Sequence, residues 1–291
     1  MSLKDDTKLQ IAWRQARVQL RRGLRLVDHL RQPAAYPPPQ FARHNTDFGH
    51  VHGHSTTQID RDDAAAHPTL EQGKRHNLAL AAAFFDGLVI GPHQPLAFWP
   101  TLGRITAQRG FAYGMELRGG CIVPALGGGL CLLSNALFAL GARLGWTIVE
   151  RHGHSQQAVP PPVDEIWGLD ATLFWPHVDL RMAPLQRVRL GCTVAGGQLH
   201  LQVNGKAAPL VRCEISAQGD QVLVIAGVRQ RRNVLLRKTF SQSSGELLSH
   251  ETLATNRKVL LHSWEQARSC LTCAEVHCKS RVQLGSTGGA G

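Results

Sequence analysis

Three consecutive glycines, followed by a cysteine and a long apolar run, constrain this chain more than any other feature. In GGGLCLLSNALFALGARLGW, residues 127–146, leucines recur at positions 133, 137, 140 and 144, which is the spacing of one buried helix face. Gly145 is typical of the residue that ends a helix. The pattern predicts a buried helix over Leu130–Leu144 with Cys131 in its first turn.

The first turn of a helix is a favourable place for a reactive thiol. Backbone N–H groups without partners and the positive end of the helix dipole favour a thiolate there. Gly127, Gly128 and Gly129 permit positive φ angles and close approach of a substrate, and backbone N–H groups nearby could hold an oxyanion. No Lys-Ser/Thr pair follows the glycines, which excludes a phosphate-binding loop. Cys131 is therefore a candidate nucleophile, and the alternative is a small buried hydrophobe.

A nucleophilic cysteine requires a base, and two histidines follow it in TIVERHGHSQQ. This β-favouring run predicts a strand on which His152 and His154 face the same way. We prefer His154 as the base because Ser155 beside it also resembles a site residue. Asp170 or Asp179, both in strand-like runs, is expected to orient the imidazole. The alternative is that these histidines are structural.

Length, charge and cysteine usage limit the class of protein. With 291 residues and 43% hydrophobic content, the chain can form one large core or two modest domains. It shows no secretory signal and no run of about 18 apolar residues, which predicts a cytoplasmic protein whose seven cysteines are reduced. The formal net charge of +11 favours an anionic neighbour, but the absence of a nucleic-acid motif and 6% aromatic content argue against nucleic acid as a partner.

Much of the positive charge lies in one segment near the start of the chain. Residues 8–31 place arginines at helical spacing, with Leu20, Leu24 and Val27 on another side and Trp13 suited to an interface. The pattern predicts a basic amphipathic helix that lies on an anionic membrane or in a partner's groove. Such contact would make the protein peripheral to the inner face of the membrane. The alternative, which we prefer, is a surface helix packed on its own domain.

A proline-rich stretch, RQPAAYPPPQF, ends this helix and opens a stiff linker. His50, His52 and His54 follow at alternate positions, so they would face one side of an extended segment and could bind zinc or nickel. We prefer a polar loop, because the segment contains two glycines and no thiol.

Further patterns predict the remaining elements. HNLALAAAFFD predicts a buried helix over Arg75–Asp86, followed by short strands at Leu88–Ile90 and Leu96–Trp99. From Arg187, alternating runs with Asn204-Gly205 as a hairpin signal predict a small antiparallel sheet. A basic cluster over residues 229–238 is expected to be a solvated face or an anion-binding surface.

The C-terminal segment SCLTCAEVHC holds Cys270, Cys273 and Cys278, with His277 between the last two. A CxxC pair is half of a zinc site, so this segment predicts a zinc ion or an iron–sulfur cluster. The alternatives are a redox pair or inert thiols. The cysteine chemistry proposed above requires no cofactor.

The string GGGLCLLSNALFALGARLGWTIVERHGHS resembles the VanW family, whose members carry a GGG-[IL]-CQ-x-S signature followed by an ERHxHS-like signature. The resemblance extends back through residues 74–103 and forward through residues 170–181. Leu132 departs from the pattern, because the family usually has glutamine there. The positions that match the signatures are Gly127, Gly128, Gly129, Cys131, Ser134, Glu150, Arg151, His154 and Ser155.

The family is named for an accessory protein of vancomycin (glycopeptide) resistance clusters, and this chain is similar to its short cytoplasmic members. The resemblance implies a peptide-like or cell-wall precursor ligand, with Ser134, Glu150 and Arg151 among the binding residues. A glutamine often lines the oxyanion hole of papain-like enzymes, so Leu132 supports a non-catalytic accessory or binding protein as the alternative. A metal-binding protein organised around the C-terminal cysteines is a second alternative.

These observations predict an α+β fold: a VanW-like core with a cysteine-bearing helix packed on short strands, followed by a small antiparallel β module. The predicted chemistry is acyl transfer or amide hydrolysis, in which Cys131 attacks a carbonyl and His154 moves the proton. The predicted divisions are the basic helix (1–32), the linker (33–66), the core (67–186), the β-rich module (187–265) and the cysteine-containing tail (266–291).

Overall fold

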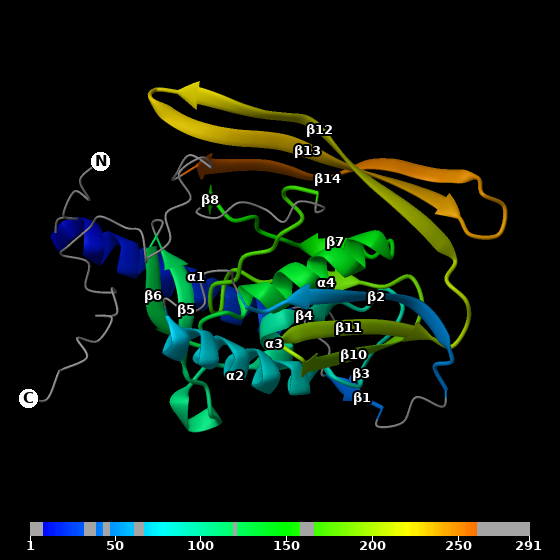
Figure 1. Cartoon of the computed structure of the whole chain (residues 1–291), viewed down its shortest axis with the longest axis horizontal. Helices are drawn as coiled ribbons and strands as arrows, with labels where there is room; N and C mark the ends of the chain where they lie inside the picture. Colours follow the sequence, from blue (N-terminus) through cyan, green and yellow to red (C-terminus); the bar gives the residue numbers. More distant parts are fainter. Residues whose placement is uncertain are drawn as a thin grey trace, which may run out of the picture.

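The structure is a computed structural model that describes residues 8–31, 39–42, 47–60, 67–118, 121–157 and 166–260. Its helices pack beside several largely antiparallel sheets, which confirms the predicted α+β class (Figure 1). One hydrophobic core runs through α2, α4 and the sheets, and its largest fully buried side chains include Phe85, Phe98 and Phe138.

A five-stranded sheet forms one side of the body, in the order β1-β3-β10-β11-β2. Its central hairpin turns at Gly196-Gly197, both with positive φ, because a two-residue turn with that twist requires residues without a Cβ. The prediction of a hairpin turn at Asn204-Gly205 was wrong, because both residues lie within strand β11 and pair there with β2. The bounds are β1 Gln40–Phe41, β2 His50–Gln58, β3 Leu88–Ile90, β10 Val188–Ala195 and β11 Gln198–Gly205.

The histidine-rich segment is strand β2, so the preferred prediction of a polar loop was wrong. The whole strand pairs with β11, from Gln58 opposite Gln198 to His50 opposite Gly205. Burial alternates along its second half, where Ser55 and Thr57 are partly buried while His54, Thr56 and Gln58 are exposed. The local composition suggested a loop. The strand forms because it pairs with β11, which lies about 140 residues further along the chain and cannot be inferred from the local sequence.

A second sheet of long strands crosses above the cysteine-bearing helix (Figure 1). Its order is β12-β13-β14-β8, with β8 parallel to β14. The bounds are β8 Gln156–Gln157, β12 Val211–Ile225, β13 Val228–Ser241 and β14 Leu247–Leu260. The strands after residue 187 therefore divide between two sheets, and β10 and β11 pair with strands that precede them. The predicted domain divisions remain predictions about independent folding.

Two helices of the body, α4 and α2, were predicted, and a third, α3, lies where a strand was expected. α4 covers Cys131–Arg143 and packs between β12 and β2, as the leucine spacing indicated. α2 covers Pro68–Phe85 and begins seven residues before the predicted start, because proline is favoured in the first turn. α3 covers Phe98–Leu102, so the predicted strand over Leu96–Trp99 is cut short at β4, Leu96–Ala97.

The remaining elements frame the first turn of α4. β5 (Tyr113–Arg118) and β6 (Cys121–Leu126) form a hairpin that leads into the glycines, after a short 3-10 helix at Ala107–Arg109. β7 (Thr147–Glu150) and β9 (Arg181–Ala183) form a three-stranded sheet with β4. β7 ends at Glu150, so the predicted strand does not extend through the two histidines.

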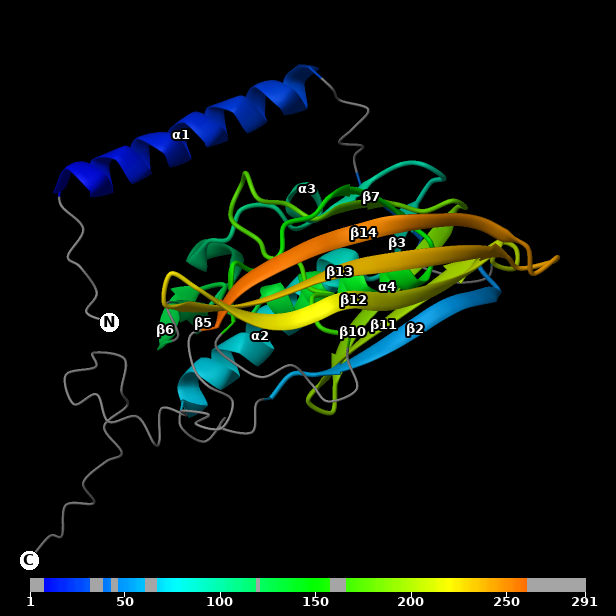
Figure 2. The same ribbon diagram turned by 90° about the horizontal axis from the view of Figure 1, so that it is seen from above.

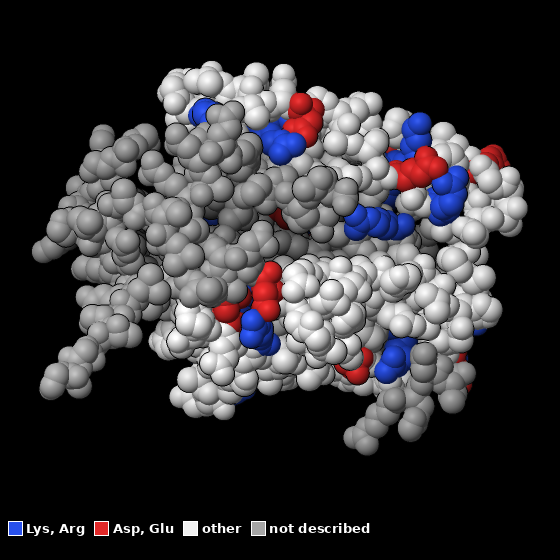
Figure 3. Space-filling view, viewed as in Figure 1, with Lys and Arg blue, Asp and Glu red and all other residues white. Residues whose placement is uncertain are grey.

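The basic segment is helix α1, Lys8–Arg31, as predicted, and it lies along one side of the body (Figure 2). No helix in the described part of the chain is long and apolar enough to span a bilayer. On the face seen in Figure 3, Lys and Arg alternate with Asp and Glu rather than forming one basic patch.

Candidate active site

The glycine turn holds the start of α4 against α2 and β5. Gly127 and Gly129 both have positive φ angles, of 74° and 101°, which permit the sharp entry into the helix. A Cβ on Gly128 would lie 2.4 Å from the carbonyl carbon of Gly114, so only glycine allows this contact between backbones. The side-chain amide of Asn77, which is fully buried, donates to Gly128 O at 3.0 Å. These contacts give the glycines a packing role.

Two of the three predicted glycine N–H groups, those of Gly127 and Gly128, are not available to hold an oxyanion. Gly127 N donates to Ala112 O and Gly128 N donates to Ala125 O, each at 2.9 Å. Both N–H groups are therefore occupied within the fold, and the predicted role of the two glycines in binding an oxyanion needs correction. The backbone N–H groups in the first turn of α4, where Cys131 lies, are the remaining candidates for holding an oxyanion.

Two side chains of α4 fix the strand-like segment that carries Asp170. Ser134 is fully buried, and its hydroxyl donates to Ala171 O at 2.6 Å. Asn135 Oδ1 accepts the hydrogen bond of Ala171 N at 2.8 Å. Both backbone groups of residue 171 are thus bound to α4, which places Asp170 next to the turn that bears Cys131.

His154 lies between Cys131 and Asp170. Its Nδ1 is 2.5 Å from Asp170 Oδ2, and its backbone N–H donates to the same oxygen at 2.9 Å. Although burial lowers the pKa of His154, hydrogen bonds with Asp170 and with Cys131 outweigh it and raise that pKa to about 9. Since Nδ1 faces Asp170, the other ring nitrogen, Nε2, is the one left for the thiol. Cys131 itself is partly exposed.

Asp170 is held by two cations in addition to His154. Lys258 Nζ, from β14, lies 2.6 Å from Asp170 Oδ1, and Arg151 Nη2 lies 3.3 Å from the same oxygen. Burial raises the pKa of Asp170, but the hydrogen bond from His154 and the charge of Lys258 lower it well below its usual range. The carboxylate therefore stays ionised throughout the physiological pH range.

The structure separates the two predicted aspartates. Asp179 is buried and accepts hydrogen bonds from Trp99 N at 3.0 Å and Leu180 N at 2.9 Å. Burial raises its pKa to about 7. Asp179 therefore fixes the start of α3, and Asp170 is the aspartate that contacts His154.

The other residues of the ERHGHS signature have separate contacts. His152 is half exposed and its Nε2 lies 3.1 Å from Glu150 Oε1 rather than near the thiol. Glu150 also receives Arg25, at 2.5 Å, and its pKa is lowered to about 2 by these hydrogen bonds against the effect of burial. Ser155 is exposed, and its carbonyl accepts Val259 N.

Arg151 is nearly buried and stabilises the loop around Asp170. Its guanidinium donates to Asp170 O and Gly168 O, both at 2.7 Å, and to Asn256 Oδ1 at 3.0 Å. It also stacks over the ring of Phe138 in α4. All of these partners belong to the protein itself, so Arg151 has a structural role and fixes the position of the loop that carries Asp170.

Sequence reasoning missed Asn77, Asn135 and Lys258. Asn77 and Lys258 are buried polar residues, which generally require a hydrogen-bond partner, but the sequence alone does not show that these positions are buried. Lys258 lies on the same face of β14 as the buried residues Asn256 and Leu260. Its contact with Asp170 depends on the position of β14 in the folded protein, which the sequence of this strand alone does not show.

The predicted metal sites receive no support from the described residues, where no group of three or more His, Cys, Asp or Glu side chains could hold an ion. His52 Nε2 binds Ala207 O at 2.8 Å instead of converging with its neighbours. Cys270, Cys273, His277 and Cys278 lie outside the described residues.

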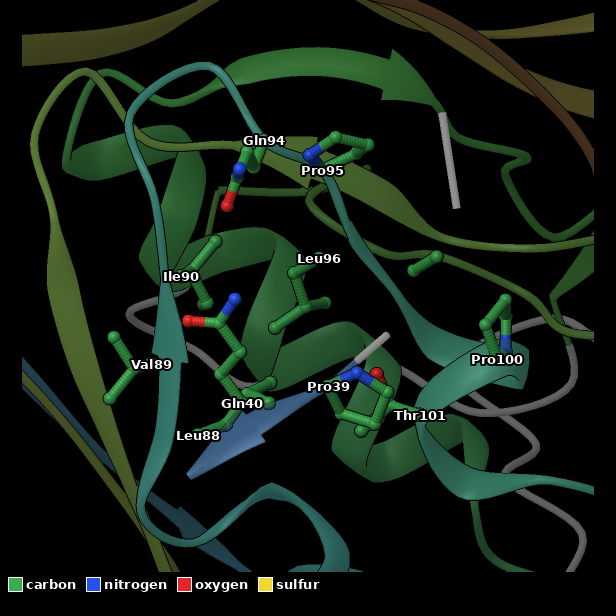
Figure 4. Close-up of a pocket in the computed structure, with 11 residues that line it drawn as sticks. Pro39, Gln40, Leu88, Val89, Ile90, Gln94, Pro95, Leu96, Pro100 and Thr101 are labelled. Atoms are coloured by element: carbon green, nitrogen blue, oxygen red, sulfur yellow. The ribbon is translucent and has the colours of Figure 1, made fainter. Parts of the chain in front are cut away.

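A surface hollow lies away from the thiol, between β3, β4 and α3 (Figure 4). Its lining residues include Leu88, Leu96 and Thr101. None of the predicted site residues lines it. The Cys131–His154 pair is therefore a partly exposed site on the surface rather than part of this hollow.

Comparison with known proteins bears on the same residues. A family model described as VanW like protein matches residues 73–204, which include the glycine turn, Cys131, His154 and Asp170. Residues 73–204 of the chain are therefore similar to the VanW family.

Two relatives share part of this VanW region. The vancomycin B-type resistance protein VanW of Enterococcus faecalis is 34% identical over 113 residues, 38% of this chain and 41% of the relative. The uncharacterized protein YoaR of Bacillus subtilis is 31% identical over 112 residues, 38% of this chain and 35% of the relative. The chain thus matches about two fifths of the length of these relatives. No solved structure matches it.

Proposed function

We propose that Cys131, His154 and Asp170 form a catalytic site for acyl transfer or amide hydrolysis on a peptide-like substrate. The observation that carries the proposal is the chain of contacts in which His154 binds Asp170 through Nδ1 at 2.5 Å and also contacts the side chain of Cys131. This is the arrangement of nucleophile, acid–base and orienting group that cysteine acyl transfer requires.

The raised pKa of His154 suits an imidazolium at neutral pH, which can donate a proton to a leaving group. In the proposed first step, the thiolate of Cys131 attacks the amide carbon, a C–S bond forms, and the carbonyl electrons move to oxygen. The imidazolium gives its Nε2 proton to the leaving nitrogen as the C–N bond breaks, which leaves a thioester and a neutral His154. His154 then takes a proton from water or from an acceptor amine, which attacks the thioester and releases Cys131.

Asp170 stabilises the imidazolium and fixes the ring orientation throughout both steps. Lys258 and Arg151 keep Asp170 ionised and in place, so these two cations act as positioning residues. The proposed oxyanion donor is the backbone N–H of Cys131 in the first turn of α4. Leu132 packs partly against the core, so it supplies no polar group where the family usually has glutamine.

We propose a cell-wall precursor as the substrate class and glycopeptide resistance as the physiological setting. The support is the similarity of residues 73–204 to the VanW family and to an enterococcal protein named for vancomycin resistance. That support is one of association, because a shared fold does not determine the substrate.

The proposal is tested by the rate at which iodoacetamide alkylates Cys131 at neutral pH, followed by peptide mass spectrometry. Cys131 should react faster than Cys213, which is also partly exposed, and the rate should fall about tenfold or more in His154→Ala. His152→Ala is the matched control, because His152 contacts Glu150 and should leave the rate unchanged.

Equal rates for Cys131 in the wild type and in His154→Ala would remove the catalytic proposal. The chain would then be better described as an accessory protein that binds a cell-wall intermediate, with Cys131 in a packing role.

A further inference from the structure

The outward face of α1 is apolar, and the face toward the body is basic. Trp13, Leu20, Leu24 and Val27, here called the apolar stripe, are between 42% and 64% exposed. On the opposite side, Arg25 is nearly buried and donates to Glu150 Oε1 at 2.5 Å and to His177 O at 3.0 Å. An amphipathic helix packed on its own domain would place these faces the other way round.

The charges around α1 support this orientation. Arg21, Arg22 and Arg25 all act together with burial to lower the pKa of His177, so the basic side of the helix lies next to that loop. The contact with the body is therefore polar, and it leaves the apolar stripe without a described partner. The prediction that α1 packs on its own domain holds for its basic face only.

We propose that α1 binds the surface of an anionic lipid membrane through the apolar stripe. The stripe runs from Trp13 to Val27, a rise of about 21 Å along the helix, which suits a helix lying flat in the interfacial region. Trp13 at one end is the residue type that favours this region. Arg17 is exposed beside the stripe and can reach lipid phosphates.

Charge selects a membrane over a second copy of the chain as the occupant. α1 contains seven Lys or Arg residues and one Asp, a net charge of +6 within a chain whose total is +11. Two such helices packed together would bring like charges close, whereas an anionic leaflet attracts them. The binding would hold Glu150, and the residues that follow it to His154, at the membrane surface.

Vesicle co-sedimentation of the full chain tests the proposal. We expect binding to vesicles of phosphatidylcholine with phosphatidylglycerol, weaker binding at high salt, and little binding to phosphatidylcholine alone. The double substitution Leu20→Glu and Leu24→Glu should weaken the binding by roughly a hundredfold, because two large apolar groups lose their burial.

The matched control is the pair Leu247→Glu and Leu248→Glu at the start of β14, where both residues are about half exposed. This control changes charge and hydrophobicity equally and should bind as the wild type does. Unchanged binding after substitution of the stripe, or no binding by the wild type, would overturn the proposal.

A third result would assign the stripe to a protein partner. If the wild type does not bind vesicles but is a dimer that the Leu20→Glu and Leu24→Glu substitutions dissociate, the lipid proposal is wrong. The test does not involve Cys131, so the chemistry proposed above stands or fails separately.

Discussion

Asp170→Asn should strongly lower the pKa of His154. In the wild type that pKa is raised from 6.5 to about 9, even though burial alone would lower it. At about 1.36 kcal/mol per pKa unit, the shift of about 2.5 units corresponds to an upper limit of about 3 to 4 kcal/mol in favour of the imidazolium. The imidazole side chain is 33% exposed, so solvent screening reduces the real figure.

The substitution removes the largest stabilising contact of the imidazolium and leaves Lys258 and Arg151 without their carboxylate. Two nearby positive charges then oppose protonation of His154, and only Cys131 continues to favour it. We therefore expect the pKa of His154 to fall by roughly 2 units, to about 7 or below. NMR titration of the imidazole resonances, assigned with His154→Gln, measures it directly.

Two further variants distinguish this contact from general effects of mutation. Asp179→Asn changes a buried aspartate that contacts Trp99 N, so it should leave the pKa of His154 near 9. Lys258→Gln removes a positive charge beside Asp170 and should leave that pKa high or raise it. A pKa near 9 in Asp170→Asn, or an equal fall in Asp179→Asn, would refute the reasoning.

Three other expectations follow from the same contacts. Protonation of His154 stabilises the folded state fully below about pH 6.5, and this contribution is lost as pH rises through about 9. The thermal unfolding midpoint should therefore fall between these two pH values, and it should fall less in His154→Gln. A midpoint that does not change with pH over this range would contradict the expectation. Gly128→Ala should cost more than about 2 kcal/mol in urea unfolding because its Cβ meets backbone, whereas Gly23→Ala in α1, with nothing within 4 Å, should cost nothing. Ser134→Ala should cost about 1 to 3 kcal/mol by leaving a buried carbonyl unsatisfied, and a smaller loss would show that another donor replaces the hydroxyl.

The sequence alone determined the local features of this protein. The leucine spacing after the glycines predicted the bounds of the helix of Cys131 to within one residue at each end, because the period of a helix can be recognised from a single continuous segment. The basic helix over residues 8–31 followed from the same period. The paired signatures around Cys131 and His154 indicated a resemblance to the VanW family, and the family model matches residues 73–204, which contain both.

Only the tertiary structure decided which residues meet. Asp170 and Asp179 lie in similar strand-like runs, and their roles differ because Ser134 and Asn135 fix residue 171 beside α4, while Asp179 lies under the start of α3. Lys258 reaches Asp170 from a strand 88 positions away. Such contacts depend on how sheets pair and pack, and a periodic pattern in one segment carries no information about its distant partner. The outward direction of the apolar stripe on α1 was likewise set by the contact between Arg25 and Glu150.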